Sequence, residues 1–214
     1  MASTSTRNNI SRSWLVDAQT AARSLLGCVL VRETCRGIIR ARIVETEAYL
    51  PDDPASHSFA GQSARNRSMF GRAGLAYVYR IHRSVCLNVV TGITGRGEAV
   101  LIRAAEPLEG LELARRLRAA ASPARVAPEG VALMNGPGKL CQALEVTLEL
   151  DGIDLLARDR LWLERGARRA GVRVEVSARI GITRASDLPL RFYEAGNPWV
   201  SRQRSVTSSS AVEG

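Results

Sequence analysis

The residues of this 214-residue chain best suited to chemistry lie between positions 42 and 49, which read Arg-Ile-Val-Glu-Thr-Glu-Ala-Tyr. In a β-strand, alternate side chains point to the same side, so Glu45, Glu47 and Tyr49 share a face with the apolar residues before them. Carboxylates at the edge of an apolar surface lose part of their hydration, and such a site can tune a general base. Ordinary ion pairs with nearby arginines fit this spacing equally well.

Three other segments carry polar groups at suggestive positions. His57 follows two aspartates in a polar loop, where histidines are common, so it carries little weight by itself. Arg65 and Arg67 flank an asparagine in the same loop, and this run fits either a phosphate site or a solvated loop. Residues 135–140 read Asn-Gly-Pro-Gly-Lys-Leu, which differs from a phosphate-binding loop at its first glycine and its Ser/Thr position. That segment predicts a turn into a helix whose N-terminus could hold a DNA phosphate.

Thiols and imidazoles are few, since the chain has four cysteines and two histidines. The cysteines stand far apart without a Cys-x-x-Cys motif, so they build neither a zinc site nor a disulfide framework. Cys28, Cys86 and Cys141 lie in apolar runs, which is typical of buried structural thiols. We therefore expect the protein to use neither a metal nor a cofactor.

The chain is strongly basic, with 30 Lys and Arg residues against 21 Asp and Glu residues and a net charge of +9. Lys139 is the only lysine, so nearly all of these cations are arginines. Arginine forks phosphate oxygens and stacks on bases, which favours a nucleic-acid partner. A GC-rich genome explains arginine in place of lysine but not the excess of cations over anions.

The periodicity of the chain predicts short helices and strands that neither alternate regularly nor repeat. This pattern favours an α+β domain around a mainly antiparallel sheet. A long ordered loop over residues 50–74 is expected to contain one helical turn near Ser68. The remaining predicted elements are helices over 17–26 and 113–121 and strands within 28–32, 38–49, 75–90, 99–104, 161–163 and 172–182.

Length and composition fit one globular domain, which we place at residues 14–202. We expect a flexible N-terminal arm over residues 1–13 and a disordered tail over 203–214, because both ends are polar. No window is apolar enough for a membrane helix, and the start lacks the apolar core of a signal peptide. We therefore expect a cytoplasmic protein. We also expect it to be a monomer.

Ten segments in the family's order together resemble the alkyladenine (3-methyladenine) DNA glycosylase family. The resemblance extends over roughly residues 21–201. No single segment is decisive, but so many collinear ones make coincidence implausible. The segments are Ser-Leu-Leu-Gly (24–27), Ile-Val-Glu-Thr-Glu-Ala-Tyr (43–49), Ala-Ser-His (55–57), Arg-Asn-Arg-Ser-Met-Phe (65–70), Tyr-Val-Tyr (77–79), Cys-Leu-Asn (86–88), Leu-Ile-Arg-Ala (101–104), Glu-Pro-Leu-Glu-Gly (106–110), Gly-Pro-Gly-Lys-Leu (136–140) and Leu-Arg-Phe-Tyr (190–193).

The resemblance implies hydrolysis of the N-glycosidic bond of alkylated or deaminated purines in double-stranded DNA, after the damaged nucleotide has rotated out of the duplex. By position, Glu47 matches the general base that activates water, and Arg103 matches a residue beside that water. The implied fold is one compact domain with a curved antiparallel sheet flanked by helices. The residues that match the family's base pocket are Tyr49, His57, Tyr79 and Asn88.

One segment departs from the family pattern. The family has a Tyr-Gly-Met-aromatic run whose tyrosine enters the DNA gap, whereas residues 81–85 here read Ile-His-Arg-Ser-Val and are one residue shorter. His82 lies nearest to the inserted position, and its imidazole stacks over less area than a phenol. The residues expected at the DNA gap or along the DNA backbone are His82, Arg65, Arg67 and Lys139.

Two rival functions fit part of this pattern. A non-catalytic nucleic-acid-binding module of the same fold would gain nothing from an unneutralised Glu47 that faces a polyanion. A small-molecule nucleoside hydrolase would not need the surplus of cations. Strand cleavage through a Schiff base needs an amine in the pocket, and the only lysine, Lys139, lies in a turn. We therefore expect a monofunctional glycosylase.

Overall fold

The structure, a computed structural model, describes residues 10–201. This part of the chain contains three α-helices, eight β-strands and four short 3₁₀ helices. The helices are α1 (Ala18–Leu25), α2 (Leu111–Ala120) and α3 (Pro137–Ala143), and the 3₁₀ helices are η1 (Arg12–Trp14), η2 (Arg67–Phe70), η3 (Gly130–Leu133) and η4 (Leu148–Leu150). The strands are β1 (Val29–Thr34), β2 (Gly37–Tyr49), β3 (Ala76–Ile81), β4 (Ser84–Val90), β5 (Ala99–Glu109), β6 (Leu161–Glu164), β7 (Val174–Ser177) and β8 (Arg191–Glu194).

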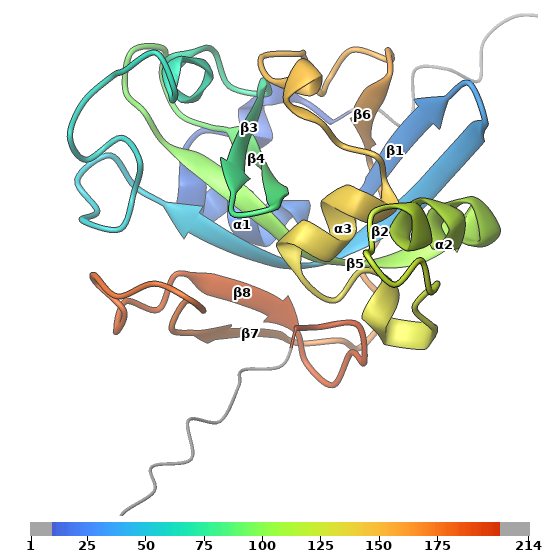
Figure 1. Ribbon diagram of the computed structural model, residues 1–214. Helices are drawn as coiled ribbons and strands as arrows, with labels where there is room; N and C mark the ends of the chain where they lie inside the picture. Colours follow the sequence, from blue (N-terminus) through green and yellow to red (C-terminus); the bar gives the residue numbers. More distant parts are fainter. Residues whose placement is uncertain (1–9, 202–214) are drawn as a thin grey trace, which may run out of the picture.

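The eight strands form one curved sheet in which neighbouring strands pair antiparallel. Six of them follow the order β3-β4-β5-β2-β1-β6, while β8 pairs with β2 and carries β7 on its other side. Figure 1 shows the β7–β8 pair below the rest of the sheet, and α3 and α2 in the right-hand half of the view. The predicted α+β class with a mainly antiparallel sheet is confirmed. Within residues 10–201, no helix is long and apolar enough to span a bilayer.

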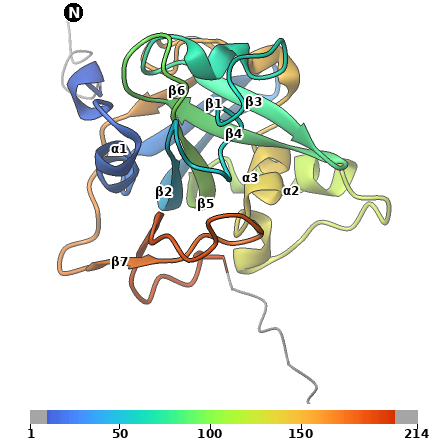
Figure 2. The same ribbon diagram turned by 90° about the vertical axis from the view of Figure 1, so that its left-hand side faces the viewer.

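The helices cover the sheet with apolar faces that the sequence already displays. Asp17 caps α1 by accepting a hydrogen bond from the Thr20 N–H at 2.8 Å, as its position predicts. Gly27 follows α1 with a φ of +87°, and a side chain there would collide with the backbone of Arg168. The turn that starts β1 therefore requires glycine. In Figure 2, α1 lies to the left of the strands and α2 and α3 lie to the right.

Strand β2 changes its buried face partway along, which corrects the expectation that one face carries both the apolar residues and the carboxylates. Ile43 belongs to the main core. Beyond it, Thr46 faces α1, where its hydroxyl bonds the Ala22 carbonyl at 2.9 Å, and Ala48 lies in the main core. The pairing with β5 is irregular around Glu45, as in a β-bulge, and such an irregularity exchanges the two faces of a strand. Glu47 therefore lies opposite the core.

The sequence prediction differs from the structure at both ends of the domain. Of the predicted strand over 172–182, only β7 forms, and the residues after it leave the sheet. Strand β8 was not predicted, because four residues are too few to show an alternating pattern. Ile10 lies in the core and Arg12 begins η1, so the end of the predicted arm is folded. Residues 1–9 and the predicted tail over 203–214 lie outside the described residues.

Candidate active site

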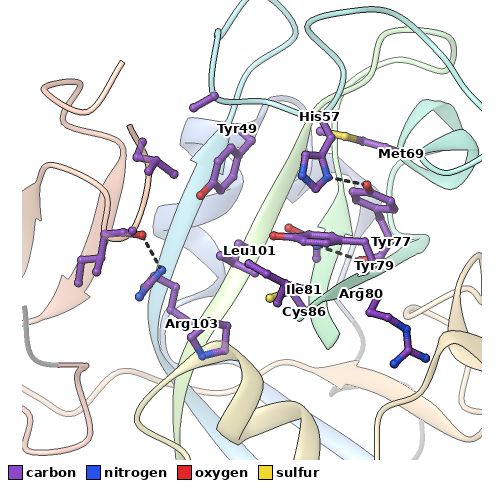
Figure 3. A pocket seen from close by; sticks show the side chains of 16 residues that line it. Tyr49, His57, Met69, Tyr77, Tyr79, Arg80, Ile81, Cys86, Leu101 and Arg103 are labelled. Carbon is purple, nitrogen blue, oxygen red and sulfur yellow. Dashed lines mark hydrogen bonds between the residues drawn. The ribbon is translucent and has the colours of Figure 1, made fainter. Parts of the chain in front are cut away.

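A cavity of about 430 Å³ opens on the side of the sheet opposite the main core. This volume lies in the range of small-molecule sites. Figure 3 shows Tyr49 on one side of the cavity, His57, Tyr77 and Tyr79 on the other, and Arg103 below Tyr49. The remaining residues that line the cavity are Ala55, Met69, Arg80, Ile81, Cys86, Asn88, Leu101, Pro137, Ile180, Gly181 and Ile182.

The aromatic wall opposite Tyr49 is held by contacts among its members. The imidazole Nδ1 of His57 lies 2.8 Å from the hydroxyl of Tyr77, and the ring meets Tyr79 edge to face at 4.4 Å between centroids. Asn88 donates from its amide to the Tyr77 carbonyl at 3.0 Å, which secures β3 against β4. Burial lowers the pKa of His57 and raises those of Tyr77 and Tyr79, so this wall is uncharged near pH 7.

Glu47 lies fully buried behind the wall formed by Tyr49, Arg103 and Ile180. Its Oε2 accepts hydrogen bonds from the Tyr49 hydroxyl at 2.9 Å and from Arg103 Nη1 at 3.1 Å. Its Oε1 accepts one from the backbone N–H of Ile180 at 2.8 Å. Burial and the Glu47 charge raise the pKa of Tyr49, which keeps that hydroxyl a donor.

Arg103 is the cation that faces both carboxylates of β2. Its Nε donates to Glu45 at 3.2 Å, and its Nη1 reaches Glu47 and lies 3.4 Å from the Ile180 carbonyl oxygen. Burial alone would lower the pKa of Arg103, but Glu47 and Glu45 outweigh burial and raise it. The guanidinium therefore stays charged. Both glutamates form ion pairs with Arg103, so the ion-pair reading of the Glu45–Glu47 pair is confirmed, and the general-base reading stays a prediction.

The loop over residues 50–74 is fixed at two points beside the cavity. Asp53 forms a buried, bidentate ion pair with Arg179, whose guanidinium also lies 4.7 Å from the centre of the Tyr49 ring. Asn66 donates to the carbonyl of His57 at 2.8 Å and accepts from Ser63. Asn66 thus has a structural role, and the predicted helical turn follows it as η2.

The residues predicted to contact DNA, Arg65, Arg67, His82 and Lys139, are all exposed. His82 occupies the two-residue turn between β3 and β4 with a φ of +50°, a conformation in which histidine is enriched among non-glycine residues. Arg65 and His82 both line a second hollow that shares His57 with the main cavity. Arg67 is exposed in η2, and Lys139 is exposed on α3, where it donates to Asn135 at 2.8 Å.

Sequence reasoning missed three parts of this site. Tyr77 is one, although the Tyr-Val-Tyr alternation places it on the face of Tyr79, so that signal was present. Arg179 and the peptide of Ile180 are the others, and they reach Asp53 and Glu47 across more than 120 residues of chain. The predicted buried thiols are confirmed, and burial raises the pKa of Cys28 to about 11. No cluster of ligands suited to a metal ion occurs within the described residues.

The fold and the cavity define a single α+β domain with a pocket lined by aromatic side chains. A sequence profile of the methylpurine-DNA glycosylase (MPG) family matches residues 13–198. A putative 3-methyladenine DNA glycosylase of Methanoculleus marisnigri is 48% identical over 192 residues, which cover 87% of this chain and 95% of that protein. The DNA-3-methyladenine glycosylase of Homo sapiens is 46% identical over 191 residues, 84% of this chain and 63% of the human protein. The chain belongs to the methylpurine-DNA glycosylase family.

Proposed function

We propose that this protein is a monofunctional DNA glycosylase of base-excision repair, which hydrolyses the N-glycosidic bond of alkylated or deaminated purines. The substrate class follows from family membership and from relatives named 3-methyladenine DNA glycosylases. The observation that carries the mechanism is the convergence of Glu47, Arg103 and the Ile180 carbonyl behind an aromatic cavity. In this proposal the damaged base rotates out of the duplex and lies between Tyr49 and the wall of His57 and Tyr79.

The hydrogen-bonding groups around the Glu47 carboxylate suit one water molecule. An ionised carboxylate has about four acceptor sites, and protein donors fill three of those of Glu47. A water could donate one proton to the fourth site, on Oε1, and the other to the Ile180 carbonyl, while it accepts from Arg103 Nη2, because Nη1 already donates to Glu47 and to that carbonyl. Its second lone pair would remain for attack. This arrangement supports Glu47 as the general base, because it can take the proton as the water oxygen attacks C1′.

The bond changes balance without an additional acid when the base is alkylated. The water oxygen bonds to C1′, the C1′–N bond breaks, and its electron pair passes to the departing base. A purine made cationic by alkylation departs neutral, so the uncharged wall around His57 need not supply a proton. Buried Glu47 also places negative charge near the oxocarbenium-like sugar.

Duplex DNA with a damaged purine is the proposed partner, in keeping with the net charge of +9. His82 at the tip of the β3–β4 turn is the proposed wedge that fills the gap in the duplex. Arg65, Arg67 and Lys139 are the proposed contacts to the DNA backbone. The cytoplasmic location and the monomeric state stay predictions.

The test replaces Glu47 with glutamine, which preserves size and removes the base. We expect the single-turnover excision rate on duplexes with one lesion each to fall by about 10² to 10⁴-fold, while lesion-DNA affinity persists. Glu112→Gln, on the exposed face of α2, is the control and should excise at the parent rate. Retention of the parent rate by Glu47→Gln would remove Glu47 from the mechanism. Binding without excision in the parent protein would favour a non-catalytic module.

A further inference from the structure

We propose that Glu45, Arg191 and Ser201 form a positioning cluster that aims Arg103 at the reaction centre, and that Glu45 does not act as a base. The proposal rests on the function proposed above, because it concerns how that site holds its arginine. The cluster lies behind Glu47 and is buried, with 0% of Glu45, 5% of Arg191 and 7% of Ser201 exposed.

The two carboxylates of β2 differ in the residues that donate to them. Glu45 accepts four hydrogen bonds: Oε1 takes Arg103 Nε at 3.2 Å, Arg191 Nε at 2.6 Å and the Ser201 hydroxyl at 2.7 Å, and Oε2 takes the Ser201 N–H at 2.7 Å. Glu47 has three donors, Tyr49, Arg103 and Ile180, and all three line the cavity. Of the three residues that donate to Glu45, only Arg103 lines it. Glu45 therefore lies behind Arg103 and away from the cavity, which separates two residues that the sequence does not distinguish.

Arg103 connects this cluster to the cavity. A guanidinium is a rigid plane, so the bond from its Nε to Glu45 sets the direction in which Nη1 points. That Nη1 is the atom shared between Glu47 and the Ile180 carbonyl. Loss of the Glu45 contact would free the plane to rotate, and the proposed water would lose a fixed donor.

Arg191 and Ser201 hold Glu45 from two separate segments. Arg191 lies opposite Glu47 in the β2–β8 pairing and donates to the Ser201 carbonyl at 3.0 Å and the Ser177 hydroxyl at 3.2 Å. Ser201 in turn donates hydrogen bonds from both its N–H and its hydroxyl to Glu45. The residues after β8 thus close back onto β2. Glu45, Glu47, Arg103 and Arg191 together carry two negative and two positive charges.

The experiment compares Glu45→Gln and Ser201→Ala with the parent protein on one lesion duplex. Single-turnover excision rate, lesion-DNA affinity and the active fraction by titration are measured for each. We expect the rate of Glu45→Gln to fall by on the order of 10²-fold, the scale of a misplaced catalytic group, with unchanged affinity. Ser201→Ala retains all four charges and should show a smaller loss of rate, which Ser201→Thr should restore because it retains the hydroxyl.

Glu194→Gln is the matched control. Glu194 is fully buried on β8, pairs with Arg42 and accepts from Asn197 at 2.8 Å, but it has no bond to Arg103. We expect it to cost stability while its active fraction excises at the parent rate. An equal loss of rate in Glu194→Gln, or a parent rate in the active fraction of Ser201→Ala, would overturn the positioning role even if Glu45→Gln does not fold. Activity in Glu47→Gln would instead overturn the proposed mechanism, so the two failures are distinguishable.

Discussion

Replacement of Arg179 by methionine should be one of the most destabilising single changes in this domain. The Arg179 side chain is 0% exposed, as is that of its partner Asp53. Removal of one member of a buried ion pair leaves the other charged and unpaired, at a cost of about 3–5 kcal/mol. For a domain of this size that loss corresponds to a Tm lower by roughly 6–20 °C. Methionine fills much of the volume, so the effect reports on charge more than on a cavity.

Urea unfolding with linear extrapolation measures the free energy of unfolding. Arg115→Met is the control, because Arg115 forms exposed pairs with Glu112 and Glu129 at 3.5 and 3.3 Å. Exposed pairs contribute less than about 1 kcal/mol. The double variant Arg179→Met/Asp53→Asn should lose less than the sum of the single variants, because it leaves no unpaired buried charge.

Unfolding of Arg179→Met at the same urea concentration as Arg115→Met would refute a stabilising buried ion pair. Additive losses at Arg179 and Asp53, without coupling, would refute it as well. Either result would mean that water reaches this pair in solution and screens it. The Tyr49 ring, which lies against the guanidinium, supplies an independent readout through near-ultraviolet circular dichroism.

Four further outcomes are expected. His82→Ala should weaken binding to lesion duplex by roughly five- to hundred-fold, the scale of one aromatic stack, with less effect on single strands in a fluorescence titration. The logarithm of the duplex association constant should fall by about 0.9 per neutralised phosphate as the logarithm of salt concentration rises, and a flat response would favour a nucleoside hydrolase. Excision should proceed at full rate in EDTA with borohydride and trap no covalent adduct, whereas an adduct lost in Lys139→Ala would identify a lyase. The lowered pKa of His57 means that the unfolded chain binds its proton first, so the free energy of unfolding should fall as the pH drops below about 6.5, and His57→Gln should flatten that fall.

The parts of the fold that were predictable depend on local chemistry. Asp17 caps α1 through a residue three positions away, and the turn near Ser68 forms within its own loop. Alternation also placed Glu47 and Tyr49 together at the end of one strand. Strand β8 shows no comparable signal, because it is set by pairing with β2 across the chain rather than by its own pattern.

The parts of the site that were not predictable depend on register and distance. The irregular pairing around Glu45 is a property of β2 and β5 together, so the sequence of β2 alone cannot show which face Glu47 occupies. The donors that distinguish Glu47 from Glu45 come from positions 180, 191 and 201. Residue types and spacing near the two glutamates leave them equivalent.

In the proposed mechanism the peptide group of residue 180 contributes to the site, although no side chain identifies it in the sequence. Its N–H reaches Glu47 and its carbonyl lies against Arg103, so exchange of Ile180 for most other residues leaves both atoms in place. We expect the neighbouring Gly181 to be more sensitive to mutation. It has a φ of +78° and open space where a side chain would stand. Alanine at position 181 would collide with nothing, yet it disfavours that backbone by roughly 1–2 kcal/mol. We therefore expect substitution of Gly181 to disturb the Ile180 peptide more than substitution of Ile180 itself.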